Sequence, residues 1–440
     1  MALFAGGASR LHELRLALVE LAALPVLVLA ISKLLGGCPR PTPLAMLLIF
    51  GTAALPLVQL IPLPPSVWTA LPGRDQAALA LELSGLQPSW SALSFAPDKT
   101  WRSFLALLPP IAMFIGVGLS GSADRGRLVH IILGFAVLSI VLATAQVASG
   151  GDQLYLWPTT SPGTVVGFFA NRNHLATLCL LTMPLAAVMG ARVLRRQDRS
   201  DKLTLWLSIL FICMMVLSLG VIRSRMGVVL LVPTLAGSIL AAWIASGGGR
   251  PKPLLLGLVG GATVAVGAIV IFALTPLLAR FDTAGVREGR FENWPIVAEA
   301  ANTYLPLGSG LGSFDAVYRS VEPLELLDST FFNQAHNEYL EIWLETGWLG
   351  AALICVFLVW FIRRSWTAWR ARPGRERDIQ RAASIGIGVV LLHSAVDYPL
   401  RTETIAVIVA MMCALLDMAA RSDEELTVDM KSARRRQRAD

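Results

Sequence analysis

Residues 203–245 decide the fold class: LTLWLSILFICMMVLSLGVIRSRMGVVLLVPTLAGSILAAWIA. Two apolar runs, 203–222 and 226–245, are separated only by Arg223, Ser224 and Arg225. Each run has about the 20 residues that a helix needs to cross the roughly 30 Å hydrocarbon core of a bilayer. This stretch therefore predicts two membrane-spanning helices joined by a short turn that carries arginine.

Runs of the same kind occur along the whole chain, and eleven of them predict bilayer-spanning helices. The eleven ranges are 14–35, 43–61, 101–119, 128–148, 174–191, 203–222, 226–245, 253–274, 341–362, 383–399 and 403–420. The chain is therefore expected to be an all-α, polytopic integral membrane protein that forms one membrane domain over residues 1–440.

The composition excludes an ordinary soluble globular protein. Of the 440 residues, 55% are hydrophobic and 15% are charged, and the mean hydropathy is +0.62. The net charge of +7 falls in short clusters between apolar runs, which indicates membrane topology and disfavours nucleic-acid binding. The five cysteines show no CxxC spacing, so neither a disulfide framework nor a zinc site is expected.

Lysine and arginine in the short loops set the expected orientation. Residues 192–202 carry five of them, 363–381 carry seven, and the basic tail 421–440 carries six. Basic loops stay in the cytoplasm. The loops 62–100 and 149–173 are therefore expected on the outer face.

The number of crossings stays open between eleven and twelve. Eleven spans with a cytoplasmic tail place the N-terminus outside, where Arg10 and Arg15 fit poorly with the same charge rule. A twelfth crossing, supplied by the Pro-rich stretch 62–72 or by a long first segment, would place the N-terminus inside.

Residues 275–340 are too long for a simple connection between spans. The segment holds nine carboxylates and four arginines, and its pattern predicts one or two short amphipathic helices joined by a Gly-rich turn. We therefore expect a helical cap on the outer face of the membrane.

Several arginines lie near membrane depth on the outer face, where the charge rule disfavours them. Arg223 and Arg225 lie in the 203–245 stretch, Arg172 lies in ANRNHLA, and Arg290 opens the cap segment after Arg287. Snorkelling or a salt bridge to a loop carboxylate is the plain explanation. The alternative is an outward-facing anion site, since guanidinium groups are permanently charged and suit phosphate oxygens.

His336, in QAHNEYLEIWLETGWLG, is the histidine of the cap segment and lies where that segment enters a span. It is either structural or a proton acceptor, for which imidazole is suited near neutral pH. His393 and Asp397 are four residues apart, and a structural hydrogen bond or ion pair is the favoured interpretation there. Asn171 and Asn173 are expected to cap a helix start.

The sequence lacks the motifs for nucleotide binding, for metal-dependent catalysis and for serine hydrolases. The run Gly308–Gly312 has no Walker lysine, and the chain shows no HExxH, GxSxG or carboxylate array with metal-ligand spacing. A mechanism without metal or cofactor is therefore the default expectation.

Four segments together resemble the O-antigen ligase superfamily, which also holds polysaccharide polymerases and protein O-oligosaccharyltransferases. They are SRMG at 224–227, ANRNHLA at 170–176, the GRFENW segment at 289–294 before PLGSGLGSF, and QAHNEYLEIWLETGWLG at 334–350. The resemblance covers roughly 165–420, and the last segment is its most specific part.

The resemblance implies a GT-C-like helical glycosyltransferase of the bacterial inner membrane. Such an enzyme takes a glycan from undecaprenyl pyrophosphate and transfers it to an acceptor hydroxyl on the periplasmic face. The essential histidine then corresponds to His336, and the arginines to Arg225 and Arg290, with Arg223 and Arg172 as neighbours. For this chemistry, inversion at the anomeric carbon is expected.

Three functions remain as alternatives. A ligase joins the glycan to lipid A core or another acceptor, and a polymerase joins repeat units to a growing glycan; the resemblance slightly favours the ligase. A transporter for a lipid-linked glycan is the third, although the charged candidates gather on one face instead of near the midplane.

Overall fold

The structure is a computed structural model that describes residues 1–8, 13–36, 41–150, 153–158, 164–196, 202–248, 267, 289–327 and 332–418. It is an all-α membrane protein, as predicted, with 76% of the described residues in helices. Among the described residues the strands are one short antiparallel pair, β1 (Pro62–Leu63) with β2 (Ser91–Ala92).

Among the residues that the structure describes, seven helical stretches are long and apolar enough to cross a membrane. They are α2 (Glu13–Leu35), α6 with α7 (Pro97–Leu105 and Leu108–Leu119), α8 (Ser122–Ala148), α9 (Arg172–Arg196), α10 (Lys202–Ile222), α11 (Arg225–Ala245) and α15 (Glu338–Arg370). Each corresponds to a predicted span. The predicted span 253–274 lies outside the described residues.

Three further predicted spans correspond to helices that are not among these seven, because they are too short or not apolar enough. They are α3 (Pro43–Gln59), α16 (Arg375–Ser394) and α17 (Glu403–Asp417). α16 begins at Arg375, earlier than the predicted span 383–399, because its first turns are charged and do not belong to the apolar run. It ends at Ser394, where the chain turns before Asp397. α17 has only 15 residues and is buried along almost its whole length, so neighbouring helices cover it.

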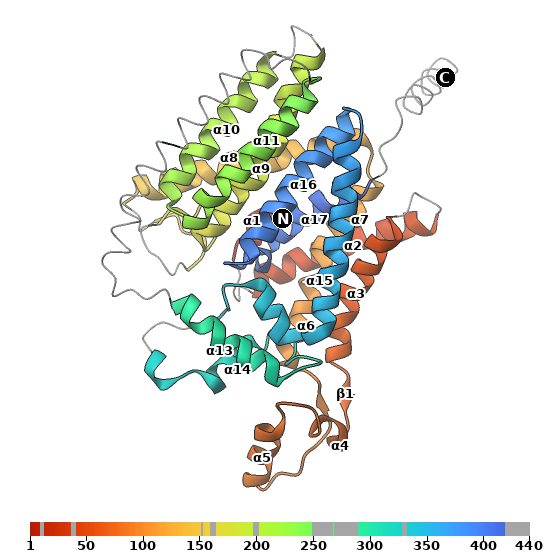
Figure 1. The fold of residues 1–440 in the computed structure, drawn as a ribbon, viewed down its shortest axis with the longest axis vertical. Helices are drawn as coiled ribbons and strands as arrows, with labels where there is room; N and C mark the ends of the chain where they lie inside the picture. Colours follow the sequence, from red (N-terminus) through yellow and green to blue (C-terminus); the bar gives the residue numbers. More distant parts are fainter. Residues whose placement is uncertain are drawn as a thin grey trace.

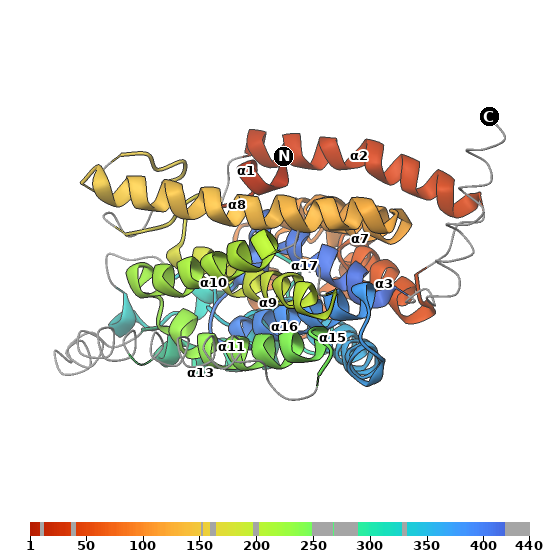
Figure 2. The same ribbon diagram turned by 90° about the horizontal axis from the view of Figure 1, so that it is seen from above.

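α9 forms the centre of the bundle. In its most apolar stretch, 83% of the residues are buried. The helix is apolar on every side and packs against α10, α11 and α16. Figure 2 shows α2 and α8 along one side of the bundle and α11 and α15 along the other, with α9, α16 and α17 between them. The loops before α9 and after α16 therefore meet near the middle of one end.

Two helical additions extend that end of the bundle, which we call the cap end (Figure 1). The first, between β1 and β2, contains α4 (Pro65–Trp68) and α5 (Asp75–Leu83). The second contains α13 (Gly289–Thr303), α14 (Phe314–Val321) and the 3-10 turn η2 (Leu324–Leu326). The described part of the predicted cap segment is thus helical, and it packs around Val297, Phe314 and Leu344 as a small second core.

Arg74 fastens the first addition to the bundle. It is 3% exposed, it donates a hydrogen bond to the carbonyl of Leu93, and its guanidinium lies 3.6 Å from the ring centroid of Phe95. Burial lowers the pKa of Arg74 to about 10, which still leaves the group charged at neutral pH and able to bind the ring face.

The N-terminal residues also lie at the cap end. α1 (Ala2–Ala5) packs on α17: Oγ1 of Thr404 donates to the carbonyl of Ala2 at 2.9 Å, and the N–H of Thr404 donates to Gly6 at 3.1 Å. The N–H of Ala170, before α9, donates to the carbonyl of Gly7 at 3.1 Å. This N-terminal latch, residues 2–7, therefore ties together the loops before α9 and before α17.

The position of the latch bears on the number of crossings. α17 runs from the cap end to the opposite end, here called the far end, where Asp417 contacts Thr42 at the start of α3. The N-terminus and the end of α17 thus lie at opposite ends of the bundle, which requires an odd number of crossings. Arg15, which had counted against this arrangement, donates to the carbonyl of Leu156 and lies 4.7 Å from the Trp157 ring centroid. This favours eleven over twelve.

Candidate active site

A buried carboxylate, Asp397, connects the predicted motifs at the cap end. It lies in the turn after α16 and is 1% exposed. Its Oδ2 accepts a hydrogen bond from Nδ2 of Asn173 at 2.5 Å, and its Oδ1 lies 3.3 Å from Nδ1 of His336. The N–H of Tyr398 also donates to Oδ1, at 3.0 Å. Three segments far apart in the sequence therefore meet at one side chain.

His336 is held in a strained backbone conformation. Its φ angle is 50°, in the left-handed region that residues other than glycine rarely adopt. The preceding residue is fixed from two sides: the N–H of Ala335 donates to Oε2 of Glu341 at 2.9 Å, and its carbonyl accepts from Nε1 of Trp294 at 2.8 Å. Such strain persists only where the surroundings impose it, and it is concentrated at functional sites.

The imidazole of His336 has two different sides. Nδ1 faces the buried Asp397, whereas no described residue forms a hydrogen bond with Nε2. The side chain is 22% exposed, and the rings of Tyr398 and Phe332 lie 4.8 and 6.1 Å from it between centroids. A carboxylate that accepts from Nδ1–H favours the tautomer whose lone pair is on Nε2. His336 is thus arranged to accept a proton from a group that enters the site.

The start of α9 is joined to the start of α11 through Asn173. Asn171 caps α9, since its Oδ1 accepts from the N–H of Asn173 at 2.8 Å, which confirms the predicted cap for Asn171 but not for Asn173. The amide of Asn173 donates to Asp397, and its Oδ1 accepts from Oγ of Ser224 at 2.9 Å. Ser224 in turn caps α11 by accepting from the N–H of Gly227 at 3.2 Å. A continuous chain of hydrogen bonds therefore runs from the SRMG turn to His336.

Three of the four predicted anion-binding arginines directly adjoin residues of this chain in the sequence. Arg225, the first residue of α11, follows Ser224 directly and is exposed. Arg223 precedes Ser224, is exposed, and has a φ of 55°. Arg172 is the first residue of α9 and is half-buried. Arg290 lies in the first turn of α13, four residues before Trp294, and its side chain lies outside the described residues.

Three buried glutamates, Glu338, Glu341 and Glu345, follow His336 on one face of α15. Glu341 and Glu345 each lie 3.0 Å from Nη2 of Arg401, and Oε1 of Glu345 accepts from the N–H of Gly312 at 2.8 Å. Glu338 accepts from Ser394 and from the N–H of Leu400, the latter at 2.8 Å. Their spacing in NEYLEIWLE, at positions i, i+3 and i+7, marks one helix face.

This network couples the His336 segment to its neighbours. Glu341 accepts a hydrogen bond from the residue before His336, and Glu345 accepts one from the N–H of Phe314, at the Gly-rich turn before α14. Arg401, in the loop after α16, forms an ion pair with Glu341. Removing one partner of such a buried ion pair leaves an uncompensated charge. The glutamates therefore position the loop and are not placed to touch a substrate.

Two further histidines lie beneath His336. His393 is fully buried, its Nδ1 pairs with Oγ1 of Thr177 at 2.9 Å, and its Nε2 lies 3.9 Å from Oδ2 of Asp397, in line with the predicted structural pairing. His174 is 1% exposed and packs against the ring of Tyr398. The prediction missed that Asp397 also reaches His336. The sequence signal was a carboxylate at the end of an apolar span, directly before Tyr-Pro.

Within the described parts of the chain, no group of three or more His, Cys, Asp or Glu side chains is arranged to hold a metal ion. The described site offers a partly exposed imidazole edge, linked by hydrogen bonds to Ser224, the residue between Arg223 and Arg225. Such an imidazole can accept a proton.

Comparison with known families adds one match. Residues 203–355 match the family model described as O-antigen ligase. The matched range includes the SRMG turn, α13, the Gly-rich turn and the His336 segment and supports the resemblance to the O-antigen ligase superfamily over these residues, whereas ANRNHLA at 170–176 lies before it. No functionally curated protein gave a significant match to the chain.

Proposed function

We propose that this protein of the O-antigen ligase superfamily is a glycosyltransferase that moves a glycan from undecaprenyl pyrophosphate to an acceptor hydroxyl. The family supports a membrane enzyme of O-antigen ligase or polymerase type. The donor, the ligase reaction, the absence of a metal requirement and the inversion at the anomeric carbon are our proposal. In it, the cap end faces the periplasm and the far end faces the cytoplasm of a bacterial inner membrane.

One observation carries the proposal: the hydrogen-bonded chain that runs from Ser224 through Asn173 and Asp397 to His336. It joins a proton acceptor to the turn that carries Arg225, and it does so at the end of the bundle covered by the cap helices. A glycosyl transfer from a pyrophosphate needs both parts, a base for the acceptor and positive charge for the leaving group.

The base step follows from the geometry of His336. Nε2 takes the proton of the acceptor hydroxyl while that oxygen forms a bond to the anomeric carbon. The bond from the anomeric carbon to the pyrophosphate oxygen breaks, and the electron pair leaves with the pyrophosphate. Asp397, which faces Nδ1 at 3.3 Å, stabilises the imidazolium that results.

The leaving group gains negative charge as its bond breaks. Arg225 and Arg290 are proposed to bind the pyrophosphate, with Arg223 and Arg172 beside them. Fixed guanidinium groups whose contacts strengthen in the transition state lower the barrier. Arg401 does not belong to this set, because Glu341 and Glu345 already compensate its charge.

The test is transfer in a defined system. The purified full chain, in lipid nanodiscs, is mixed with an undecaprenyl-pyrophosphate glycan and with lipid A core or a second lipid-linked glycan as acceptor. We expect formation of the glycan-acceptor product and release of undecaprenyl pyrophosphate without added metal, even with a chelator present. Product formed on lipid A core identifies a ligase, and product formed on the lipid-linked glycan identifies a polymerase. Failure with every acceptor class would contradict the proposal.

A further inference from the structure

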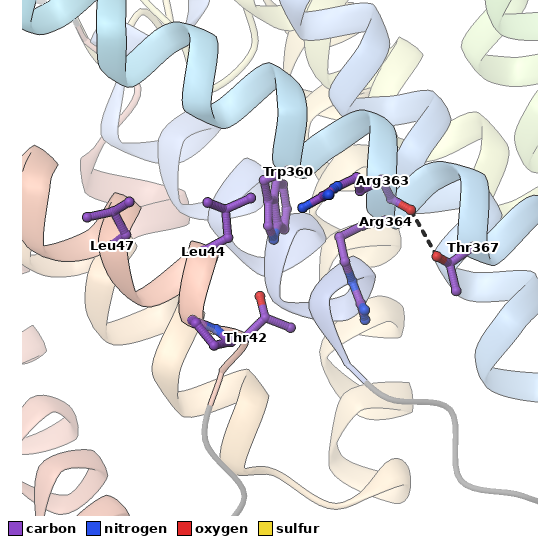
Figure 3. Close-up of a pocket in the computed structure, with 8 residues that line it drawn as sticks. Thr42, Leu44, Leu47, Trp360, Arg363, Arg364 and Thr367 are labelled. Atoms are coloured by element: carbon purple, nitrogen blue, oxygen red, sulfur yellow. Dashed lines mark hydrogen bonds between the residues drawn. The ribbon is translucent and has the colours of Figure 1, made fainter.

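A cavity at the far end of the bundle lies between the start of α3 and the second half of α15 (Figure 3). Its volume is about 550 Å³. The lining residues are Thr42, Pro43, Leu44, Leu47, Trp360, Arg363, Arg364 and Thr367. α3 separates this cavity from the candidate active site, since Gln59, at the other end of that helix, donates to the carbonyl of Glu345.

One wall of the cavity continues into an apolar surface. Leu47 is 54% exposed, and Phe50 on the same helix is 65% exposed. On α15, Val359 and Ile362 are 49% and 62% exposed. In a membrane protein such exposed apolar flanks face lipid chains. An acyl chain can therefore pass from the bilayer along this surface into the cavity.

The α15 side of the cavity also carries one positive charge, on Arg363, that the described residues do not compensate. The guanidinium of Arg364 already has partners: it donates to carbonyl groups at the end of α17 and lies 3.7 Å from Oδ1 of Asp417. Asp417 is further bound by Thr42 and by Nε1 of Trp360 at 2.9 Å. Arg363 is exposed, and within the described part of the chain no residue forms an ion pair or side-chain hydrogen bond with its guanidinium.

Two neighbouring features place the cavity at the level of lipid headgroups. α3, a helix of 17 residues, begins at Pro43 inside the cavity, so the cavity lies at the level of a helix end. Trp366 is 59% exposed, with the guanidinium of Arg370 lying 4.1 Å from its ring centroid. Tryptophan and arginine at one level mark the interface between hydrocarbon and water.

We propose that this cavity binds one anionic phospholipid of the surrounding bilayer. The phosphodiester lies against Arg363, and an acyl chain lies along Leu44 and Leu47. A phosphodiester carries one negative charge, which matches the single uncompensated guanidinium. A zwitterionic headgroup brings its own cation and gains less from Arg363. Basic pockets between helices at the cytoplasmic side are a known mode of lipid-headgroup recognition.

Binding is measured by native mass spectrometry of the delipidated full chain. Phosphatidylglycerol and phosphatidylethanolamine with the same acyl chains are titrated in parallel, since they share the phosphodiester and the chains while the first headgroup is anionic and the second zwitterionic. We expect the wild type to prefer phosphatidylglycerol. Arg363→Gln should weaken phosphatidylglycerol binding roughly fivefold and leave phosphatidylethanolamine unchanged. Leu47→Trp, which fills the apolar part of the cavity, should weaken both lipids.

The matched control is Arg127→Gln on α8. Arg127 also lies at the far end, is exposed, and pairs with Asp124 at 2.8 Å, away from the cavity. It should leave both affinities unchanged. Equal binding of the two lipids by the wild type, or an Arg363→Gln variant that keeps the full preference, would overturn the proposal. An equal loss in both arginine variants would show a general charge effect and would also overturn it.

Discussion

The buried aspartates Asp417 and Asp397 lie at opposite ends of the bundle and have different partners. At the far end, Asp417 binds Thr42, Nε1 of Trp360 and Arg364, all from regular helices or their caps. At the cap end, Asp397 binds Asn173 and His336. A guanidinium keeps its charge at every physiological pH, whereas an imidazole gains and loses a proton near neutrality. The far-end contact is therefore permanent, and the cap-end contact is suited to a proton that comes and goes.

The backbone shows the same contrast. Trp360 and Arg364 lie within the long helix α15, whereas His336 and Arg223 have φ angles of 50° and 55° in the left-handed region. The far end thus uses relaxed structure to hold helices together. The cap end holds strained residues next to partly exposed polar groups, which is typical of a site whose geometry serves a reaction.

The largest expected effect is on His336. Replacing it with alanine removes the proposed proton acceptor and should lower the transfer rate about 10²- to 10⁴-fold. The rate is measured as product formed from the lipid-linked glycan by the purified variant in nanodiscs. Membrane insertion and the melting temperature should remain close to wild type. A variant with full activity would remove His336 from the mechanism.

Replacing each aspartate by asparagine tests whether Asp397 and Asp417 have different roles. In Asp397→Asn, the amide keeps the shape of the side chain but no longer stabilises an imidazolium, so the transfer rate should fall roughly 10²-fold. Asp417→Asn, the matched change at the far end, should leave the rate per folded protein near wild type. Equal losses of activity in the two variants would mean that Asp397 is no more than a structural residue.

A smaller loss of rate is expected for Arg225→Lys. The charge is kept, but the planar pair of donors for phosphate oxygens is lost, so transfer should slow roughly tenfold. Arg319→Lys on α14 provides a control, because Arg319 pairs with Asp315 at the surface of the cap. Equal kinetics in Arg225→Lys and wild type would assign Arg225 a structural role.

Stability should respond at the far end. Asp417→Asn weakens the contact with Arg364 and should lower the free energy of unfolding by about 1 to 3 kcal/mol, less than for a fully buried pair because the Arg364 side chain is 20% exposed. Thermal unfolding in detergent, followed by tryptophan fluorescence, measures the change. A melting temperature equal to that of wild type would show that this contact contributes nothing.

The smallest effect is expected for Trp360→Phe. It removes the donor to Asp417 but keeps most of the ring, so the cost should be about 1 kcal/mol. The same thermal measurement detects it, and the transfer rate should not change. A loss of activity with normal stability would contradict the division of roles between the two ends.

Much of the fold could be predicted from the sequence, because a helix that crosses a bilayer needs an apolar run of fixed length. α10 and α11 therefore begin and end within a residue of the expected spans. α17 shows where this reasoning is limited: it has 15 residues, and its neighbours cover it so completely that its length was not set by the bilayer.

The site was predictable in part. His336 and Arg225 could be singled out because their residue types are unusual at those places, but their connection through Asn173 and Asp397 depends on how α9, α11 and α16 pack. Asp397 was interpreted as the partner of His393, four residues away on the same span, because local spacing is all that a sequence displays. Its contact with His336 comes from a distant segment, and no local pattern reveals it.

The N-terminal latch has a consequence for biogenesis. Ala2 and Thr404, which meet through one hydrogen bond, are 402 residues apart in the chain. Translation delivers the first of these residues to the membrane long before the second, so the loops that flank Asp397 close only after the final helix has entered the bilayer. A nascent or prematurely terminated chain therefore has the arginine-bearing turn but lacks the completed surroundings of Asp397, so the proposed transfer would require the last step of insertion.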